Sequence, residues 1–269
     1  MSALAPAIAS RFEHGLTRAL YEWWLLIALA VAWIAASALN LIPNSVFPDT
    51  QTLARTTVDL VTGKVGVLGK LTDHVWISFA RFAVGYSIAA GIGILIGLLM
   101  ATSSLVAALI LPILRLLYPI PGLAWTPLVI MWAGIGENAV IVLIFLSAVW
   151  PIVYGAYDGF RNIPRNYMLV CRQLGATWSV RVRRVLLPAA LPMLFSGLRL
   201  GHGMGWRAIV GAEMIAAVTG VGYMLNMGGE LRRPDVVVVG MIVIAIMSAL
   251  LDRFVFGTLE DRLILRWKR

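Results

Sequence analysis

The side chains with the widest chemical options lie in one long apolar run, between residues 182 and 218. In its part over residues 193–218, five side chains are charged or carry a ring nitrogen that can hydrogen bond: Arg199, His202, Trp206, Arg207 and Glu213. At 100° per helical residue, all but Arg207 fall within about 60° of arc, so a helix gathers four of them into one polar stripe. An ionisable group in hydrocarbon costs about 2.5–3.5 kcal/mol, and such groups usually face water, a partner or a cavity. We interpret the five as candidate lining of a translocation path, in which the arginines or a protonated His202 would favour an anion.

Each of these residues also has a structural interpretation. Arg199 lies near one end of the run and can extend to the membrane interface. Glu213 lies towards the other end and can pair with Arg81 or Arg207, and a lone membrane histidine such as His202 is more often a packing residue than a ligand. On the opposite side of the same predicted helix, three small residues recur every four positions and predict a close helix contact: Gly197, Gly201 and Gly205.

The sequence carries none of the common catalytic motifs. It contains no G-x-x-x-x-G-K-[ST] phosphate loop and no H-E-x-x-H, and its three histidines are scattered. The single cysteine, Cys171, excludes an internal disulfide. A membrane enzyme using His202 and Glu213 as an acid–base set stays an alternative, although a second convergent carboxylate is missing. A secondary transporter driven by protons through Glu213 is the other alternative, which the lack of an evident inverted repeat weakens.

A basic segment over residues 165–192 separates two of the apolar runs. Its charges are Arg165, Arg172, Arg181, Arg183 and Arg184. Within it, Gly175 is followed by nine residues and then by V-L-L-P at 185–188. A charged loop of a membrane protein can fix the orientation of the chain or dock a partner.

The composition sets the class of fold. Of 269 residues, 60% are hydrophobic and 13% charged, and the mean hydropathy is +0.88. A soluble domain of this length is not so apolar, so the sequence predicts an all-α, polytopic membrane protein. The formal net charge of +9 comes from arginines between apolar runs, which is typical of cytoplasmic loops rather than of nucleic-acid binding.

The apolar runs predict six transmembrane helices: about 23–41, 75–100, 123–135, 139–160, 193–218 and 236–256. Prolines shorten and kink the third, and Pro188 and Pro192 predict a break before the fifth. Between the spans we expect a short external helix near 50–62, a cytoplasmic-side helix over 103–118 and an external hairpin over 219–235. For the first run a cleaved secretory signal ending at residues 36–38 is the alternative, which its span length disfavours.

The distribution of basic residues predicts the orientation. Fourteen fall on the side that we assign to the cytoplasm: Arg11, Arg18, Arg115, Arg161, Arg165, Arg172, Arg181, Arg183, Arg184, Arg253, Arg262, Arg266, Lys268 and Arg269. Five fall outside: Arg55, Lys64, Lys70, Arg232 and Arg233. This bias predicts that both termini are cytoplasmic and that the number of spans is even.

Seven short motifs, taken in order, resemble one family of membrane proteins. They are S-F-A-R-F-A-V-G at 78–85, L-Y-P-I-P-G-L-A-W-T-P-L-V-I-M-W-A-G-I-G-E at 117–137, L-G-A-T at 174–177, V-L-L-P-A-A-L-P at 185–192, G-L-R-L-G at 197–201, A-E-M at 212–214 and G-V-G-Y at 220–223. Their order and spacing are similar to those of ABC importer permeases of the nitrate/sulfonate/taurine/bicarbonate group, over roughly residues 70–257. The basic segment resembles the cytoplasmic EAA loop of these permeases, which docks an ATPase subunit.

The resemblance implies a type I ABC importer permease fold with six transmembrane helices. With the amphipathic start and the basic end of the sequence, we divide the chain into an N-terminal interfacial helix over 1–22, a permease domain over 23–257 with a coupling loop at 161–192, and a basic cytoplasmic tail over 258–269. The chain would form a homodimer among the lipids of a bacterial inner membrane, with two ABC ATPase subunits and a periplasmic or extracellular substrate-binding protein as partners, and would bind no nucleic acid. ATP and Mg²⁺ would be bound by the ATPase, leaving no cofactor in this chain. The substrate would be a small anion or zwitterion: taurine, a sulfonate, nitrate or bicarbonate.

The resemblance places the ATPase contact on nine residues: Arg165, Leu169, Arg172, Gln173, Leu174, Gly175, Ala176, Thr177 and Trp178. The chain departs from the family pattern here, because Leu169, Val170 and Cys171 stand where the pattern has E-A-A. We still expect docking, since Gly175 and the spacing after it are kept. Arg165, Arg172 or Gln173 then replaces the missing acidic contact or faces lipid headgroups.

Overall fold

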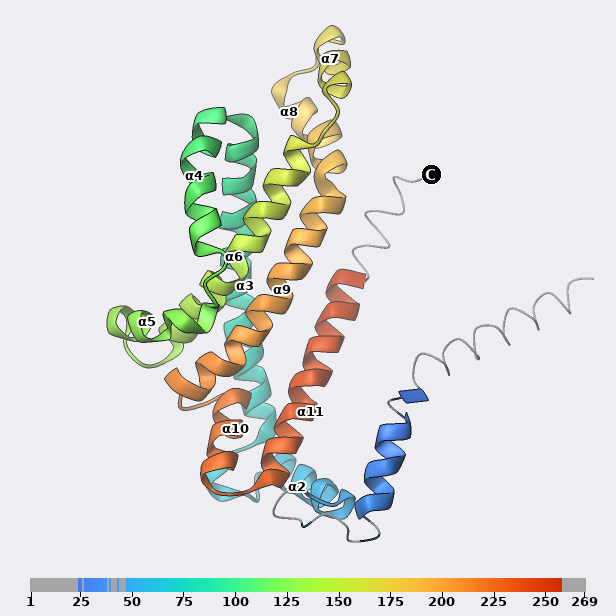
Figure 1. The fold of residues 1–269 in the computed structure, drawn as a ribbon, viewed down its shortest axis with the longest axis vertical. Helices are drawn as coiled ribbons and strands as arrows, with labels where there is room; N and C mark the ends of the chain where they lie inside the picture. Colours follow the sequence, from blue (N-terminus) through green and yellow to red (C-terminus); the bar gives the residue numbers. More distant parts are fainter. Residues whose placement is uncertain (1–23, 26, 38, 40–42, 44–46, 258–269) are drawn as a thin grey trace, which may run out of the picture.

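The computed structural model describes residues 24, 25, 27–37, 39, 43 and 47–257, and every element in this part is helical. Long helices run lengthwise, with the short helices α7 and α8 at one end of the molecule and α2 and α10 at the other (Figure 1). The predicted N-terminal helix over 1–22 and the tail over 258–269 lie outside the described residues. The all-α class predicted from composition is confirmed.

Four helices of the described part are long and apolar enough to cross a membrane. They are α3 (Leu71–Thr102), α6 (Glu137–Arg161), α9 (Leu187–Ala216) and α11 (Pro234–Leu251). These four correspond to the second, fourth, fifth and sixth predicted spans. The first predicted span falls partly outside the described residues, and its described part contains the shorter apolar helix Ile27–Ser37.

The third predicted span is one arm of a bent pair. Helix α4 (Ser104–Leu117) is followed by η2 (Gly122–Trp125) and α5 (Thr126–Ala133), and the two arms meet at 92°. The prolines at 119 and 121 cause the bend, since each lacks a backbone N–H and restricts the residue before it. Counted as one span, the pair raises the number of crossings in the described part to five. The helix predicted over 103–118 is confirmed by α4.

The predicted break at Pro188 and Pro192 is wrong. The short helix α8 (Trp178–Arg181), the π-helical turn η3 (Val182–Leu186) and α9 follow one another without interruption, so one helix covers Ser179–Ala216. Pro188 directly follows the wider π turn of this continuous helix, a local adjustment of the hydrogen-bond pattern beside the proline. Membrane helices tolerate internal prolines such as Pro192 because local adjustments satisfy the freed carbonyls.

At the end of the molecule formed by α2 and α10, one side-chain cap and one interhelical hydrogen bond hold the short helices in place. Helix α2 (Thr50–Thr62) begins at Asp49, whose carboxylate accepts from the Thr52 N–H at 2.5 Å, as a helix N-cap does. Helix α10 (Val221–Glu230) folds back against α11, which confirms the predicted hairpin. The Thr56 hydroxyl donates to Asp235 at 2.6 Å and so joins α2 to the start of α11.

Small residues hold α3, α6 and α9 together. A Cβ added at Gly197 would lie 2.7 Å from the Cα of Gly155 on α6, and one at Gly93 would lie 2.8 Å from Cγ2 of Ile152. Real Cβ atoms do not approach so closely, so both positions require glycine. The close contact predicted from the glycine spacing of the fifth span is therefore confirmed, with α6 as the partner helix.

Candidate functional site

The predicted coupling segment forms two short helices that project beyond the bundle. Helix α7 (Arg165–Gln173) ends in a turn through Gly175, whose φ of +63° is a conformation that favours glycine. The N–H of Ala176 donates to the Cys171 carbonyl at 3.0 Å, which closes the helix end. The presence of glycine at position 175 thus has a local physical reason, because the backbone must adopt a positive φ there to reverse direction before α8.

The surface of α7 is mainly apolar and basic. Leu169, Val170 and Leu174 are 54%, 51% and 78% exposed, whereas Cys171 is buried. Arg172 and Gln173 are exposed beside them. Of the other predicted contact residues, Thr177 is exposed and Ala176 half-buried, and the side chains of Arg165 and Trp178 are not among those that the structure describes.

Glu213 is enclosed in a polar network rather than facing a cavity large enough for a ligand. It is 1% exposed, and its carboxylate accepts from the Ser78 hydroxyl at 2.8 Å, from Arg81 at 3.1 Å and from the Gly222 N–H at 3.0 Å. Arg81 was one of its two predicted partners, and this ion pair is confirmed. The network joins α3 and α9 to the turn that precedes α10.

Arg199 also has an acidic partner. Its Nε and one terminal nitrogen donate to the two carboxylate oxygens of Asp252, at 2.9 and 2.6 Å. Asp252 begins the π-helical turn η4 (Asp252–Gly257) at the end of α11, so this pair ties α9 to the last span. In this conformation the charges of Arg199 and Asp252 form an ion pair.

His202 and Trp206 pack in an aromatic cluster between α3, α9 and η4. Their ring centroids lie 5.3 and 5.0 Å from that of Phe82, and the His202 ring is 5.1 Å from Phe256. Both rings are 5% exposed, and His202 Nε2 and Trp206 Nε1 have no hydrogen-bond partner in the described part of the chain. The four members of the predicted stripe therefore face α3 and η4.

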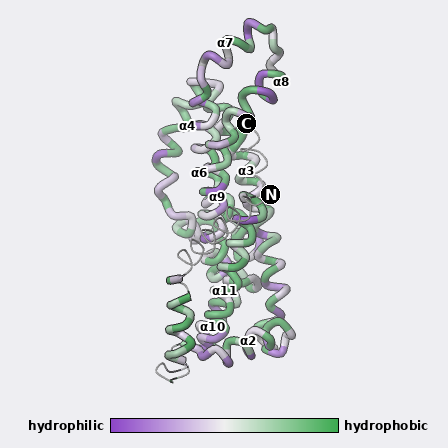
Figure 2. Tube along the Cα trace, turned by 90° about the vertical axis from the view of Figure 1, so that its right-hand side faces the viewer, coloured by the Kyte–Doolittle hydropathy of each residue, from purple (hydrophilic) through white to green (hydrophobic). Residues whose placement is uncertain are grey.

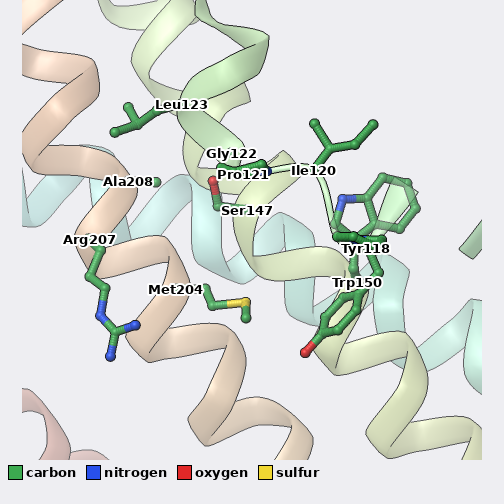
Figure 3. A pocket seen from close by; sticks show the side chains of 11 residues that line it. Tyr118, Ile120, Pro121, Gly122, Leu123, Ser147, Trp150, Met204, Arg207 and Ala208 are labelled. Atoms are coloured by element: carbon green, nitrogen blue, oxygen red, sulfur yellow. The ribbon is translucent and has the colours of Figure 1, made fainter. Parts of the chain in front are cut away.

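Arg207, the one predicted path residue off that stripe, lies at a cavity of about 270 Å³. The bend at residues 118–123, between α4 and α5, forms one wall. Ser147 and Trp150 of α6 contribute a second, and Met204, Arg207 and Ala208 of α9 a third. Figure 3 shows Arg207 on the α9 side and Tyr118 and Trp150 on the opposite side, with Met204 between them.

This cavity combines apolar walls with one cation. Arg207 is exposed, and no hydrogen bond or ion pair connects it to another described residue. Trp150 Nε1 is buried and has no acceptor among the described atoms, and the lining contains no acidic residue. Such a site suits a small molecule with one negative charge.

Two features of the site were not predicted from the sequence. Tyr118 and Trp150 were not among the candidate site residues, although the prolines after Tyr118 signal the bend that brings Tyr118 to the cavity. Nor was a role predicted for His74, whose ring accepts the Gly220 N–H at 2.9 Å and holds the turn before α10. A histidine 146 residues away in sequence gives no local sign of that contact.

Residues 93–260 match the sequence family described as binding-protein-dependent transport system inner membrane component. A permease of Bacillus subtilis named for the transport of aliphatic sulfonates is 34% identical over 252 residues, with 92% of this chain and 89% of the relative covered. The taurine transport system permease protein of Escherichia coli is 35% identical and covers 85% of this chain and 82% of its own. The nitrate import permease protein of a Synechocystis species is 36% identical over 68% of this chain and 66% of its own.

A solved structure has the same fold. A chain of the MetNI methionine ABC transporter, in an inward-facing conformation, superposes with a TM-score of 0.61 at 23% identity. The match covers 74% of this chain and 96% of that one. The predicted type I importer fold is confirmed.

Proposed function

Because this chain belongs to the family of binding-protein-dependent transport system inner membrane components, we propose that two copies of it form the translocation path of an ATP-driven importer for a small anion or zwitterion. Like its relatives, the chain is the permease component of an ABC transporter and not an enzyme. The single observation that carries the finer proposal is the projecting α7–α8 pair, joined directly to two long helices.

The apolar faces left open by the described residues support association with a second copy. Met131, Trp132 and Ile135 are 80%, 70% and 71% exposed at the α5 arm. Leu109 and Leu116 of α4 are 63% and 72% exposed. These side chains surround the bent pair, so a partner copy placed there would enclose the cavity beside it.

The coupling mechanism follows from how α7 is connected. Helix α6 enters it and the continuous helix Ser179–Ala216 leaves it. Closure of two ATPase subunits would draw the two α7–α8 pairs together, and α6 and α9, packed through their glycines, would carry that movement as a unit towards the cavity. ATP would change access to the path only to the extent that it binds one conformation better than the other.

The names of the relatives support the substrate class. They are named for aliphatic sulfonates, taurine, nitrate and bicarbonate, all small and hydrophilic. We propose that a separate binding protein delivers such a substrate from outside. The membrane-enzyme and proton-driven alternatives have lost support, because Glu213, which both would use, is paired with Arg81.

The proposed docking of the ATPase is tested by changing the turn between α7 and α8. Gly175→Glu, or deletion of residues 168–178, should abolish both uptake and copurification of the ATPase, because the positive φ at Gly175 disfavours a side chain and the new charge lies at the contact. Gly66→Glu is the matched control at the other end, since a Cβ there meets nothing within 4 Å. Uptake and complex formation that survive both coupling changes would refute the proposed function.

A further inference from the structure

We propose that the cavity beside the α4–α5 bend binds a small organic anion with one strong acid group and an apolar body, an alkanesulfonate being the type. Arg207 would bind the acid group and so act as a specificity-determining residue. This inference rests on the proposed import function and adds a selective site within the permease itself.

Arg207 is a cation in the middle of α9 for which the described residues supply no counter-charge. It lies nine residues before the end of α9, about 13 Å along the helix axis. The two other arginines well inside the long helices have acids: Arg81 pairs with Glu213 and Arg199 with Asp252. Since an unpaired charge at membrane depth is costly, Arg207 requires water or an anion in front of it.

The remaining cavity walls are apolar and favour contact with an apolar part of a ligand over contact with water. Ile120, Leu123 and Met204 line the cavity together with the indole ring of Trp150. A volume of about 270 Å³ lies just below the 300–1,000 Å³ that is usual for ligand pockets, so the occupant must be small. A short alkyl chain covers these walls, whereas nitrate or bicarbonate would leave them unfilled.

The charge of the lining discriminates between an anion and a zwitterion. A zwitterion such as taurine would bring an ammonium group into a cavity whose one charged residue is Arg207 and whose lining has no carboxylate. The ammonium would lose water without gaining an acidic partner, which is unfavourable. The cavity therefore selects the alkanesulfonate over its amino-substituted analogue.

The test uses a single introduced cysteine, in the full transporter in membranes. Cys171→Ser removes the natural thiol, and Met204→Cys places one at the cavity wall. Two thiol reagents of similar size are compared: the anionic methanethiosulfonate ethylsulfonate and the cationic methanethiosulfonate ethyltrimethylammonium. We expect the anionic reagent to react about tenfold faster, because Arg207 concentrates anions in the cavity. Arg207→Gln should remove this preference, whereas Arg55→Gln, at an exposed site on α2, should leave it unchanged.

Protection of the thiol identifies the occupant. Propanesulfonate should slow modification of Met204→Cys, while taurine and nitrate at the same concentration should not. Ile120→Cys provides a second position on the opposite wall if Met204→Cys does not assemble. Equal rates for the two reagents, an inaccessible thiol at both positions, or equal protection by taurine would overturn the inference. Because labelling does not need ATP, its failure is distinct from a failure of uptake or of ATPase docking.

Discussion

Arg81 joins four segments near the α10 end of the bundle. From α3, its guanidinium donates to Glu213 on α9 and to the carbonyl and hydroxyl of Thr219, at 3.1, 2.7 and 2.9 Å. It also lies 3.5 Å from the exposed carboxylate of Glu137, which begins α6. Buried charges are tolerated when they are paired and hydrogen bonded, so this residue fixes the turn after α9 relative to three helices.

Removing one member of the Arg81–Glu213 pair should destabilise the protein more than removing both. Glu213→Met leaves Arg81 buried without its charge partner, and a loss of about 3–5 kcal/mol in the free energy of unfolding is expected. Arg81→Met should cost a similar amount, but the double variant should lose less than either single variant. Denaturant unfolding of the purified permease, followed by tryptophan fluorescence, measures all three. Additive losses would show that the two side chains stabilise the fold independently.

Gly220 is the position in this network that should tolerate a side chain least. Its φ is +114°, and an added Cβ would collide with the Glu213 carboxylate. Gly220→Ala should therefore displace Glu213 and lower the melting temperature by several degrees, at a cost of about 1–3 kcal/mol. Gly229→Ala, in α10, meets nothing within 4 Å and is the control. Equal melting temperatures for the two variants would contradict this assignment.

At the scale of elements, α6 and α9 connect the α7–α8 end of the molecule with the cavity and pack closely against each other. Gly197 and Gly201 of α9 lie against α6 so closely that no Cβ fits, and Gly155 and Gly159 of α6 face α9 in the same way. Close backbone contact gives dispersion attraction along the whole seam, which is the main source of helix association in lipid. Movement of α7 would therefore displace the two helices together.

Widening this seam should uncouple the two ends. In Gly197→Ala the new methyl group would lie 2.7 Å from the Gly155 Cα, so the helices must separate, and a loss of about 1–3 kcal/mol is expected. ATPase activity stimulated by substrate should fall with it. On the same helix, Gly203→Ala meets nothing within 4 Å and should leave stability and stimulation unchanged. Similar behaviour of the two variants would show that the seam does not transmit coupling.

The sequence predicts the elements that depend on local pattern and fails where distant contacts decide. The cap at Asp49 and the polar bounds of α2 are local, and the helix near 50–62 was predicted correctly. The break predicted at Pro188 and Pro192 was wrong because a membrane helix accommodates internal prolines by local adjustments, such as the π turn before Pro188, which composition does not reveal. The cavity was missed since its walls come from three helices, and only Arg207 among its residues carries a charge that marks it in advance.

At the scale of the whole molecule, positive charge without acidic neighbours in the sequence is found at the α7–α8 end. No acidic residue occurs in the sequence between Arg161 and Ala212, whereas six arginines lie between 161 and 184. Hydrophilic residues gather at this end and around α2 and α10, with hydrophobic ones along the helices between them (Figure 2). A partner that docks here meets a basic surface with an apolar centre.

The balance of energies at that surface predicts which contact dominates docking. Leu174 is 78% exposed, and covering it completely would contribute about 1.5–3 kcal/mol, whereas an exposed ion pair made by Arg172 contributes about 0–1 kcal/mol. Since Leu169 replaces the acidic residue of the family pattern, docking of the ATPase should rest on the apolar contact. Leu174→Ala should then weaken the complex at least about tenfold and Arg172→Gln less than about fivefold, with little dependence on salt. Titration of ATPase subunits onto the permease in lipid nanodiscs measures both, and a larger loss for Arg172→Gln, growing at low ionic strength, would instead make the basic rim the main contact.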